Sequence, residues 1–155
     1  MAIEIERKFL VVGSEWRSEA VASKPMKQGY LGRLGRASIR VRTTEDAGYL
    51  NIKSAELGIS RREYEYAIPL DEAEEMLEGL AEGAIIDKTR YIVPVGAHTW
   101  EIDVFAGANA GLVVAEVELA TPDEDFERPA WLGKEVSDDP RYYNVCLVTH
   151  PYSDW

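Results

Sequence analysis

Charged residues recur two positions apart in several short segments of this 155-residue chain. Strand side chains alternate between two faces, so residues two apart share a face. The first example is IEIERK, residues 3–8, in which Glu4, Glu6 and Lys8 would lie on one face. On a single half-buried strand such a face is simply solvated, so the chemistry depends on whether other strands repeat the pattern.

The pattern returns in six further segments, and the charged residues sort by sign. They alternate with apolar or aromatic residues, except that Thr89 separates Lys88 from Arg90. The acidic pairs are Glu63 with Glu65, Glu101 with Asp103, and Glu116 with Glu118, whereas the basic residues are Arg40 with Arg42, Lys88 with Arg90, and the single Lys53.

Clusters of one sign favour ligands of the other sign, because buried charge is costly unless it is compensated. Carboxylate clusters supply the oxygen ligands that Mg²⁺ or Mn²⁺ takes. Lysine and arginine clusters bind phosphate oxygens, and arginine adds a forked donor geometry. Roughly eight strands are enough to close a barrel around a narrow lumen, which these faces could line. The pattern therefore favours a site for a metal complex of a polyphosphate.

The elements that would position these residues are mostly strands with a period of two. Short turn-forming segments between them suit antiparallel connections and leave little room for parallel crossovers. We therefore predict one α+β domain over residues 1–155, with an eight-stranded antiparallel β-barrel, or tunnel, and a few flanking helices. The expected strands lie near 2–12, 25–33, 37–45, 48–54, 61–69, 84–94, 98–106 and 112–120.

Three segments are expected to be helical: 14–21, 69–83 and 138–148. Segment 69–83 has apolar residues at helical spacing, with Asp71 as a candidate N-cap and Gly83 as a stop signal.

Composition narrows the class of protein. The chain is 46% hydrophobic and 29% charged, has no apolar run long enough for a membrane span, and does not begin like a signal peptide. Its net charge of -11 argues against a nucleic-acid surface, although a local basic cluster can still bind an anion. The single cysteine, Cys146, fits a reducing cytoplasm.

Other kinds of site find little support. His98 and His150 have no second histidine or cysteine at ligand spacing, so a histidine metal site is not expected. The glycines of GYLGRLG, residues 29–35, do not fit a P-loop. Arg61 and Arg62 open a strand at a turn and are expected to be surface charges.

IEIERK resembles the E-x-E-x-K signature of the CYTH superfamily, the triphosphate tunnel metalloenzymes. The segments IRVR, IK, REYEY, KTRY, EIDVF, AEVEL and WLGKEVSDDPRYYN follow in family order, so the resemblance covers nearly the whole chain. It implies an eight-stranded antiparallel tunnel and divalent-metal-dependent chemistry on triphosphate compounds. The GKEVSDDPRYYN end is most similar to bacterial inorganic triphosphatases.

The resemblance also implies roles for individual residues. Lys53 with Tyr30 would activate water, which requires that the pKa of Lys53 fall from about 10.4 towards the working pH. The role of Glu101 stays open. Metal would be held by Glu4, Glu6, Glu116 and Glu118, assisted by Asp103 and by Glu63 or Glu65, whereas phosphates would be held by Lys8, Arg40, Arg42, Lys88, Arg90 and Lys134.

The leading hypothesis is hydrolysis of inorganic triphosphate to diphosphate and phosphate, with Mg²⁺ or Mn²⁺ in a two-metal site. The alternatives are a thiamine or nucleoside triphosphatase and a class IV adenylate cyclase. A non-catalytic polyphosphate-binding module belongs to a different class, and it could dispense with the metal carboxylates. The expected partner is a small triphosphate, with neither nucleic acid nor membrane, and a homodimer stays open.

Overall fold

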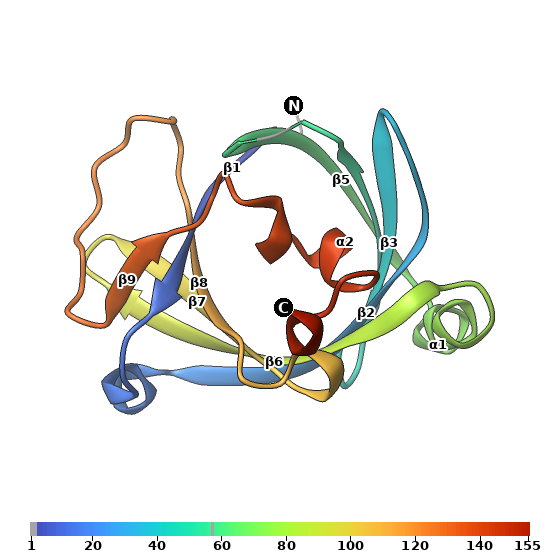
Figure 1. Cartoon of the computed structure of the whole chain (residues 1–155), viewed down its shortest axis with the longest axis horizontal. Coiled ribbons are helices and arrows are strands. Elements are labelled where there is room, and N and C mark those ends of the chain that lie inside the picture. The colour runs from blue at the N-terminus through green and yellow to red at the C-terminus, as the bar shows by residue number, and fades with distance from the viewer. Residues whose placement is uncertain (1–2, 57) are drawn as a thin grey trace.

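Nine strands form one antiparallel sheet in the computed structural model, which describes residues 3–56 and 58–155. The order is β5-β4-β3-β2-β6-β7-β8-β1-β9, and β5 also pairs with β1. Eight strands therefore close into a barrel, and β9 extends the sheet beyond β1 (Figure 1). The strands are β1 (Ile3–Val11), β2 (Ala22–Leu34), β3 (Ala37–Thr43), β4 (Gly48–Ser54), β5 (Ser60–Ile68), β6 (Glu82–Val95), β7 (His98–Phe105), β8 (Val113–Glu118) and β9 (Leu132–Glu135).

Short helices surround and cross the barrel. Helix α1 packs outside against β3 and β4, whereas the chain after β9 turns back across the ring (Figure 1). All helices within residues 3–56 and 58–155 are too short or too polar to cross a bilayer. The helices are α1 (Leu70–Gly79) and α2 (Asn144–Leu147), with 3-10 turns η1 (Glu15–Glu19), η2 (Gly107–Asn109), η3 (Pro140–Tyr142) and η4 (Tyr152–Asp154).

The predicted eight-stranded barrel is confirmed, and each predicted strand overlaps an observed one. Strand β9 was not predicted, because four residues are too few to show an alternation. The helix predicted over 138–148 is wrong in detail, since η3 and α2 are separated at Tyr143, where the backbone is extended. Helix α1 has Pro69 at its N-cap, so Asp71 lies inside the helix.

Apolar residues of the barrel wall point outward and pack under a covering loop. Phe126 and Trp131 come from the segment between β8 and β9, and they pack edge-on against Trp100 of β7 with ring centroids 5.7 and 5.4 Å apart. Phe9 of β1 packs on the same indole at 5.7 Å. This outer layer buries the apolar faces of β1, β6, β7 and β8, so the charged faces of these strands are turned to the interior.

Candidate active site

The interior of the barrel holds a cavity of about 220 Å³. Seven carboxylates and seven basic side chains line it, so the lining is balanced in charge although the whole chain carries -11. Such a lining can take a metal cation and a phosphate anion together. The charged lining residues are Glu4, Glu6, Glu63, Glu65, Glu101, Glu116, Glu118, Lys8, Arg40, Arg42, Lys53, Arg61, Lys88 and Arg90.

Strand register decides which of these side chains meet. β1 runs antiparallel to β8, which places Glu6 opposite Glu118 and Lys8 opposite Glu116. Residues directly opposite on one face of an antiparallel pair have neighbouring side chains. The signature at the N-terminus therefore meets the last acidic pair of the chain inside the barrel.

Glu6 and Glu116 form a close carboxylate pair. Burial, reinforced by the charge of Glu116, raises the pKa of Glu6 to about 8. The pKa of Glu116 lies well below its ordinary value despite burial, because Lys8 and Arg90 carry positive charge beside it and Glu6 is its hydrogen-bond partner. Glu6 thus retains a proton at neutral pH that a cation would displace.

Lys53 lies between two further carboxylates. Its Nζ is 3.2 Å from Oε1 of Glu4 and 3.0 Å from Oε2 of Glu63. Burial lowers the pKa of Lys53, but Glu6, Glu4 and Glu63 outweigh it and raise the value overall. The fall in pKa expected for a water-activating lysine is therefore absent from this state of the site.

The two carboxylates beside Lys53 have pKa values that are shifted in opposite directions. Burial raises the pKa of Glu4. Glu63 is half-buried, and although this burial opposes ionisation, its hydrogen bond with Glu4 and the charge of Lys53 lower its pKa to about 2. Glu4 and Glu63 therefore form a second acidic pair in contact.

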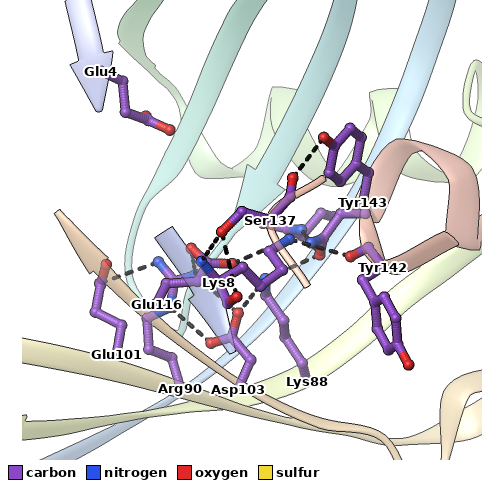
Figure 2. A network of polar contacts seen from close by, with 12 residues as sticks. Glu4, Lys8, Lys88, Arg90, Glu101, Asp103, Glu116, Ser137, Tyr142 and Tyr143 are labelled. Atoms are coloured by element: carbon purple, nitrogen blue, oxygen red, sulfur yellow. Dashed lines mark hydrogen bonds and ion pairs between the residues drawn. The ribbon is translucent and has the colours of Figure 1, made fainter. Parts of the chain in front are cut away.

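Asp103 organises the basic wall of the cavity. Its carboxylate accepts a hydrogen bond from Lys88 Nζ at 2.8 Å, and from Nε and Nη2 of Arg90 at 2.8 and 2.9 Å (Figure 2). Asp103 is fully buried and is not among the residues that line the cavity. Its role in assisting metal binding stays a prediction, and in this structure both of its oxygens accept hydrogen bonds from these two cations.

Two arginines of β3 add positive charge on another wall. Arg42 Nε donates to Gln28 Oε1 at 2.6 Å, and burial together with the charges of Arg40 and Arg90 lowers the pKa of Arg42 to about 10. Arg40 Nε is buried and has no hydrogen-bond partner in the part of the chain that the structure describes. A buried N–H of this kind is costly unless an acceptor reaches it, which fits a phosphate oxygen.

The segment after β9 closes part of the cavity and fixes two lysines. Lys8 Nζ donates to the Tyr142 carbonyl at 3.1 Å (Figure 2), and Lys88 Nζ donates to Asn144 Oδ1, also at 3.1 Å. Gln28 Nε2 donates to the same Asn144 oxygen at 2.9 Å. Sequence reasoning missed Gln28 and Asn144 as site residues, although Asn144 ends the DDPRYYN segment that carried part of the resemblance.

The structure brings most predicted site residues together, but not Lys134. This side chain is exposed on β9, outside the closed ring, and does not line the cavity. The expectation that Arg61 is a surface charge is also wrong, since Arg61 lines the cavity. Glu101, whose role was open, lies in the cavity with Arg90 Nη1 3.2 Å from its Oε2. The predicted residues that line the cavity are Glu4, Glu6, Lys8, Tyr30, Arg40, Arg42, Lys53, Glu63, Glu65, Lys88, Arg90, Glu116 and Glu118.

The donor set suits a hard divalent cation. Within residues 3–56 and 58–155, no three His, Cys, Asp or Glu side chains converge closely enough to make a ready-formed metal site. The carboxylate pairs Glu6 with Glu116 and Glu4 with Glu63 nevertheless present adjacent oxygens that share hydrogen bonds. Mg²⁺ and Mn²⁺ prefer oxygen ligands, and an ion beside such carboxylates would relieve their repulsion.

Comparisons with known proteins agree with this geometry. An inorganic triphosphatase of Acetivibrio thermocellus is 46% identical over 155 residues, which cover 100% of this chain and 99% of that protein. One of Nitrosomonas europaea is 39% identical over 150 residues, or 94% and 96% of the two chains. A crystal structure of an inorganic triphosphatase has a TM-score of 0.68 at 36% identity and covers 94% of this chain and 97% of its own. The model of the CYTH domain matches residues 2–143, which confirms the resemblance, and the chain belongs to the CYTH domain family.

Proposed function

We propose that this protein hydrolyses inorganic triphosphate to diphosphate and phosphate with the help of Mg²⁺ or Mn²⁺. The observation that carries the proposal is the closed barrel whose cavity presents acidic pairs and basic clusters together. Two relatives matching nearly the full chain bear the name inorganic triphosphatase, which supports the same reaction.

Metal would be held on the acidic side of the cavity. The proposed ligands share carboxylate chemistry and a place on β1, β5 or β8, and two ions would suit the two carboxylate pairs. A bound metal ion would neutralise phosphate charge and lower the pKa of a coordinated water. The proposed ligands are Glu4, Glu6, Glu63, Glu116 and Glu118, and at the periphery lie Glu65 of β5 and Glu101 of β7.

The basic residues would hold the triphosphate. Arg40 and Arg42 offer forked donors, and Lys8 and Lys88 offer ammonium groups that the segment after β9 already orients. Phosphoryl transfer depends mainly on positioning and on stabilising the charge of the transferring group, which these residues supply. Arg90 would act with them while Asp103 holds it in place.

Lys53 and Tyr30 are the proposed water-activating pair, and both line the cavity. If Glu4, Glu6 and Glu63 held a metal ion, their negative charge would no longer raise the pKa of Lys53. Burial and Arg40 would then lower that pKa towards the working range of a general base.

Inorganic triphosphate is preferred over larger substrates because Tyr143, Asn144 and Val145 form one wall of a cavity of about 220 Å³. A nucleoside or thiamine group would need room beyond this wall. We further propose that residues 1–155 act as one catalytic domain. The cytoplasm stays the expected location, on composition alone, and a second copy of the chain stays a candidate partner for the apolar outer face of the barrel.

The proposal is tested by measuring phosphate release from tripolyphosphate, ATP and thiamine triphosphate side by side, with Mg²⁺, with Mn²⁺ and after exhaustive chelation. We expect tripolyphosphate to be the best substrate and chelation to abolish its hydrolysis. Cyclic AMP formed from ATP, with tripolyphosphate untouched, would favour the cyclase. Tight tripolyphosphate binding with no hydrolysis under any condition would favour a binding module.

A further inference from the structure

Arg61 and Arg62 are neighbours in sequence, but they lie on opposite sides of the barrel wall. Arg61 shares the strand phase of Glu63 and Glu65 on β5, and all three line the cavity. Arg62 is exposed and does not line the cavity. The pair therefore places one arginine inside the site and an otherwise equivalent one outside it.

The basic side chains of the cavity differ in how their charge is balanced. Lys8, Lys53, Lys88 and Arg90 each form an ion pair with a carboxylate. Arg61 forms neither an ion pair nor a side-chain hydrogen bond with any residue that the structure describes. Its guanidinium is thus a cation in the cavity whose N–H donors are available to a ligand.

An aromatic ring holds Arg61 in place. The Arg61 guanidinium carbon lies 5.3 Å from the centroid of the Tyr143 ring, and Lys8 Nζ lies 5.7 Å from the same centroid. Tyr143 is itself fixed, because it is buried and its hydroxyl donates to the Ser137 carbonyl at 2.8 Å (Figure 2). A guanidinium can rest on an aromatic ring and still keep its planar fork of N–H donors free for an anion.

Arg61 lies next to the acidic side of the cavity. β1 and β5 pair with Glu4 opposite Arg61, so this arginine lies beside the proposed metal ligands, whereas Lys88 and Arg90 come from β6. A polyphosphate held by the basic wall and by a metal ion would bring anionic oxygens towards this seam.

We propose that Arg61 is a substrate-binding residue that holds a phosphate group of the triphosphate with its forked N–H donors, and that Tyr143 is the platform that positions it. The inference rests on the proposed function for the identity of the anion. It adds a cation at the β1–β5 seam to those that the sequence pattern indicated.

The test compares Arg61→Gln with Arg62→Gln, a matched removal of one charge from the adjacent position. Tripolyphosphate binding is measured by titration calorimetry in the presence of chelator, and hydrolysis is measured with Mg²⁺ or Mn²⁺. Arg61→Gln should weaken tripolyphosphate binding and lower kcat/KM by about tenfold or more, as expected for one lost charge-assisted contact. Arg62→Gln should match the wild-type protein in both measurements.

Equal tripolyphosphate affinity in the two variants would overturn the inference, while activity of the wild-type protein would still support the proposed function. Conversely, a wild-type protein without hydrolytic activity would contradict the proposed function, whereas selective loss of binding in Arg61→Gln would still support the inference. Thermal unfolding of both variants is checked first. If Arg61→Gln does not fold, Arg61→Lys replaces it: weaker binding than wild type supports the forked contact, and unchanged binding overturns it.

Discussion

Arg90 and Asp103 form a two-point ion pair inside the barrel, with Nε to Oδ1 at 2.8 Å and Nη2 to Oδ2 at 2.9 Å. Lys88 Nζ adds a third contact to the same carboxylate. All three residues are buried, so the pair lies behind the basic wall rather than on the protein surface. Asp103 is therefore a positioning residue whose removal would release two cations at once.

Asp103→Asn should be strongly destabilising, because it leaves Lys88 and Arg90 buried without their counter-charge. We expect the free energy of unfolding to fall by about 3–5 kcal/mol, measured by urea denaturation. Asp139→Asn is the control, since Asp139 pairs with Arg141 at 2.8 Å near the surface and the change should cost less than about 1 kcal/mol. Equal costs for the two variants would contradict the organising role of Asp103.

The same pair predicts a pH dependence. Although burial opposes ionisation, Arg90 and Lys88 lower the pKa of Asp103 to about 2. Because the folded pKa lies below the unfolded value of about 3.9, this stabilisation is present above that value and is lost as the pH falls towards 2. The stability difference between wild type and Asp103→Asn should therefore shrink between about pH 4 and pH 2.

Metal binding should displace a proton from Glu6. Since the pKa of Glu6 is about 8, an ion that binds its carboxylate at pH 7 should release about one proton. Calorimetric titration of Mn²⁺ in buffers of different ionisation enthalpy measures this release. We expect Glu6→Gln to lose it and Glu74→Gln, on the exposed face of α1, to retain it.

The acidic pairs should also be essential for turnover. Glu4→Gln and Glu118→Gln should abolish phosphate release from tripolyphosphate while the thermal unfolding temperature stays close to that of the wild type, because both residues line the cavity rather than the apolar layer. Full activity of the wild-type protein after exhaustive chelation would contradict the metal-dependent mechanism.

Lys53→Ala should lower kcat far more than it weakens substrate binding. The reason is that metal binding by Glu4, Glu6 and Glu63 would remove the negative charge that keeps Lys53 protonated. Wild-type activity should rise into alkaline pH, and this rise should be absent in the variant. If KM rises while kcat stays unchanged, Lys53 is a phosphate-binding residue and the base lies elsewhere.

Triphosphate binding should add a proton to Lys88. Burial, with the charges of Arg90 and Arg42, outweighs Asp103 and lowers the pKa of Lys88 to about 7, so at pH 8 the free lysine is mostly neutral. An adjacent phosphate favours the charged form. Calorimetry with tripolyphosphate and chelator at pH 8 should show more proton uptake for wild type than for Lys88→Met, and Lys27→Met, an exposed control on β2, should match wild type.

Alternation along the sequence predicts the barrel because residues two apart in a strand lie on the same face of the folded sheet. Glu4, Glu6 and Lys8 point the same way in the sequence pattern and in the structure. Arg61 is in phase with Glu63, so its inward position follows once strand β5 is known to begin at Ser60. Arg61 was expected at the surface because it lies next to a turn, and turn residues are usually exposed.

How deeply a side chain is buried, and which strands belong to the closed ring, are harder to predict from one sequence. Glu101 and Asp103 share a face of β7, but only Glu101 lines the cavity, because Asp103 is covered by Lys88 and Arg90. Which pair member lies deeper depends on packing between strands that are distant in sequence. Lys134 was misplaced for a similar reason, since β9 joins the sheet outside the ring.

The pairing of β1 with both β5 and β8 has a consequence for how the chain folds during synthesis. β1 pairs with β8 along one edge and with β5 and β9 along the other, so the first strand made must wait for residues up to Glu118 before the barrel can close. Such distant pairings form slowly and late. Glu6 and Glu118 meet only at this final step, so a nascent or partly folded chain cannot capture metal with both carboxylates, and catalytic competence arises together with barrel closure.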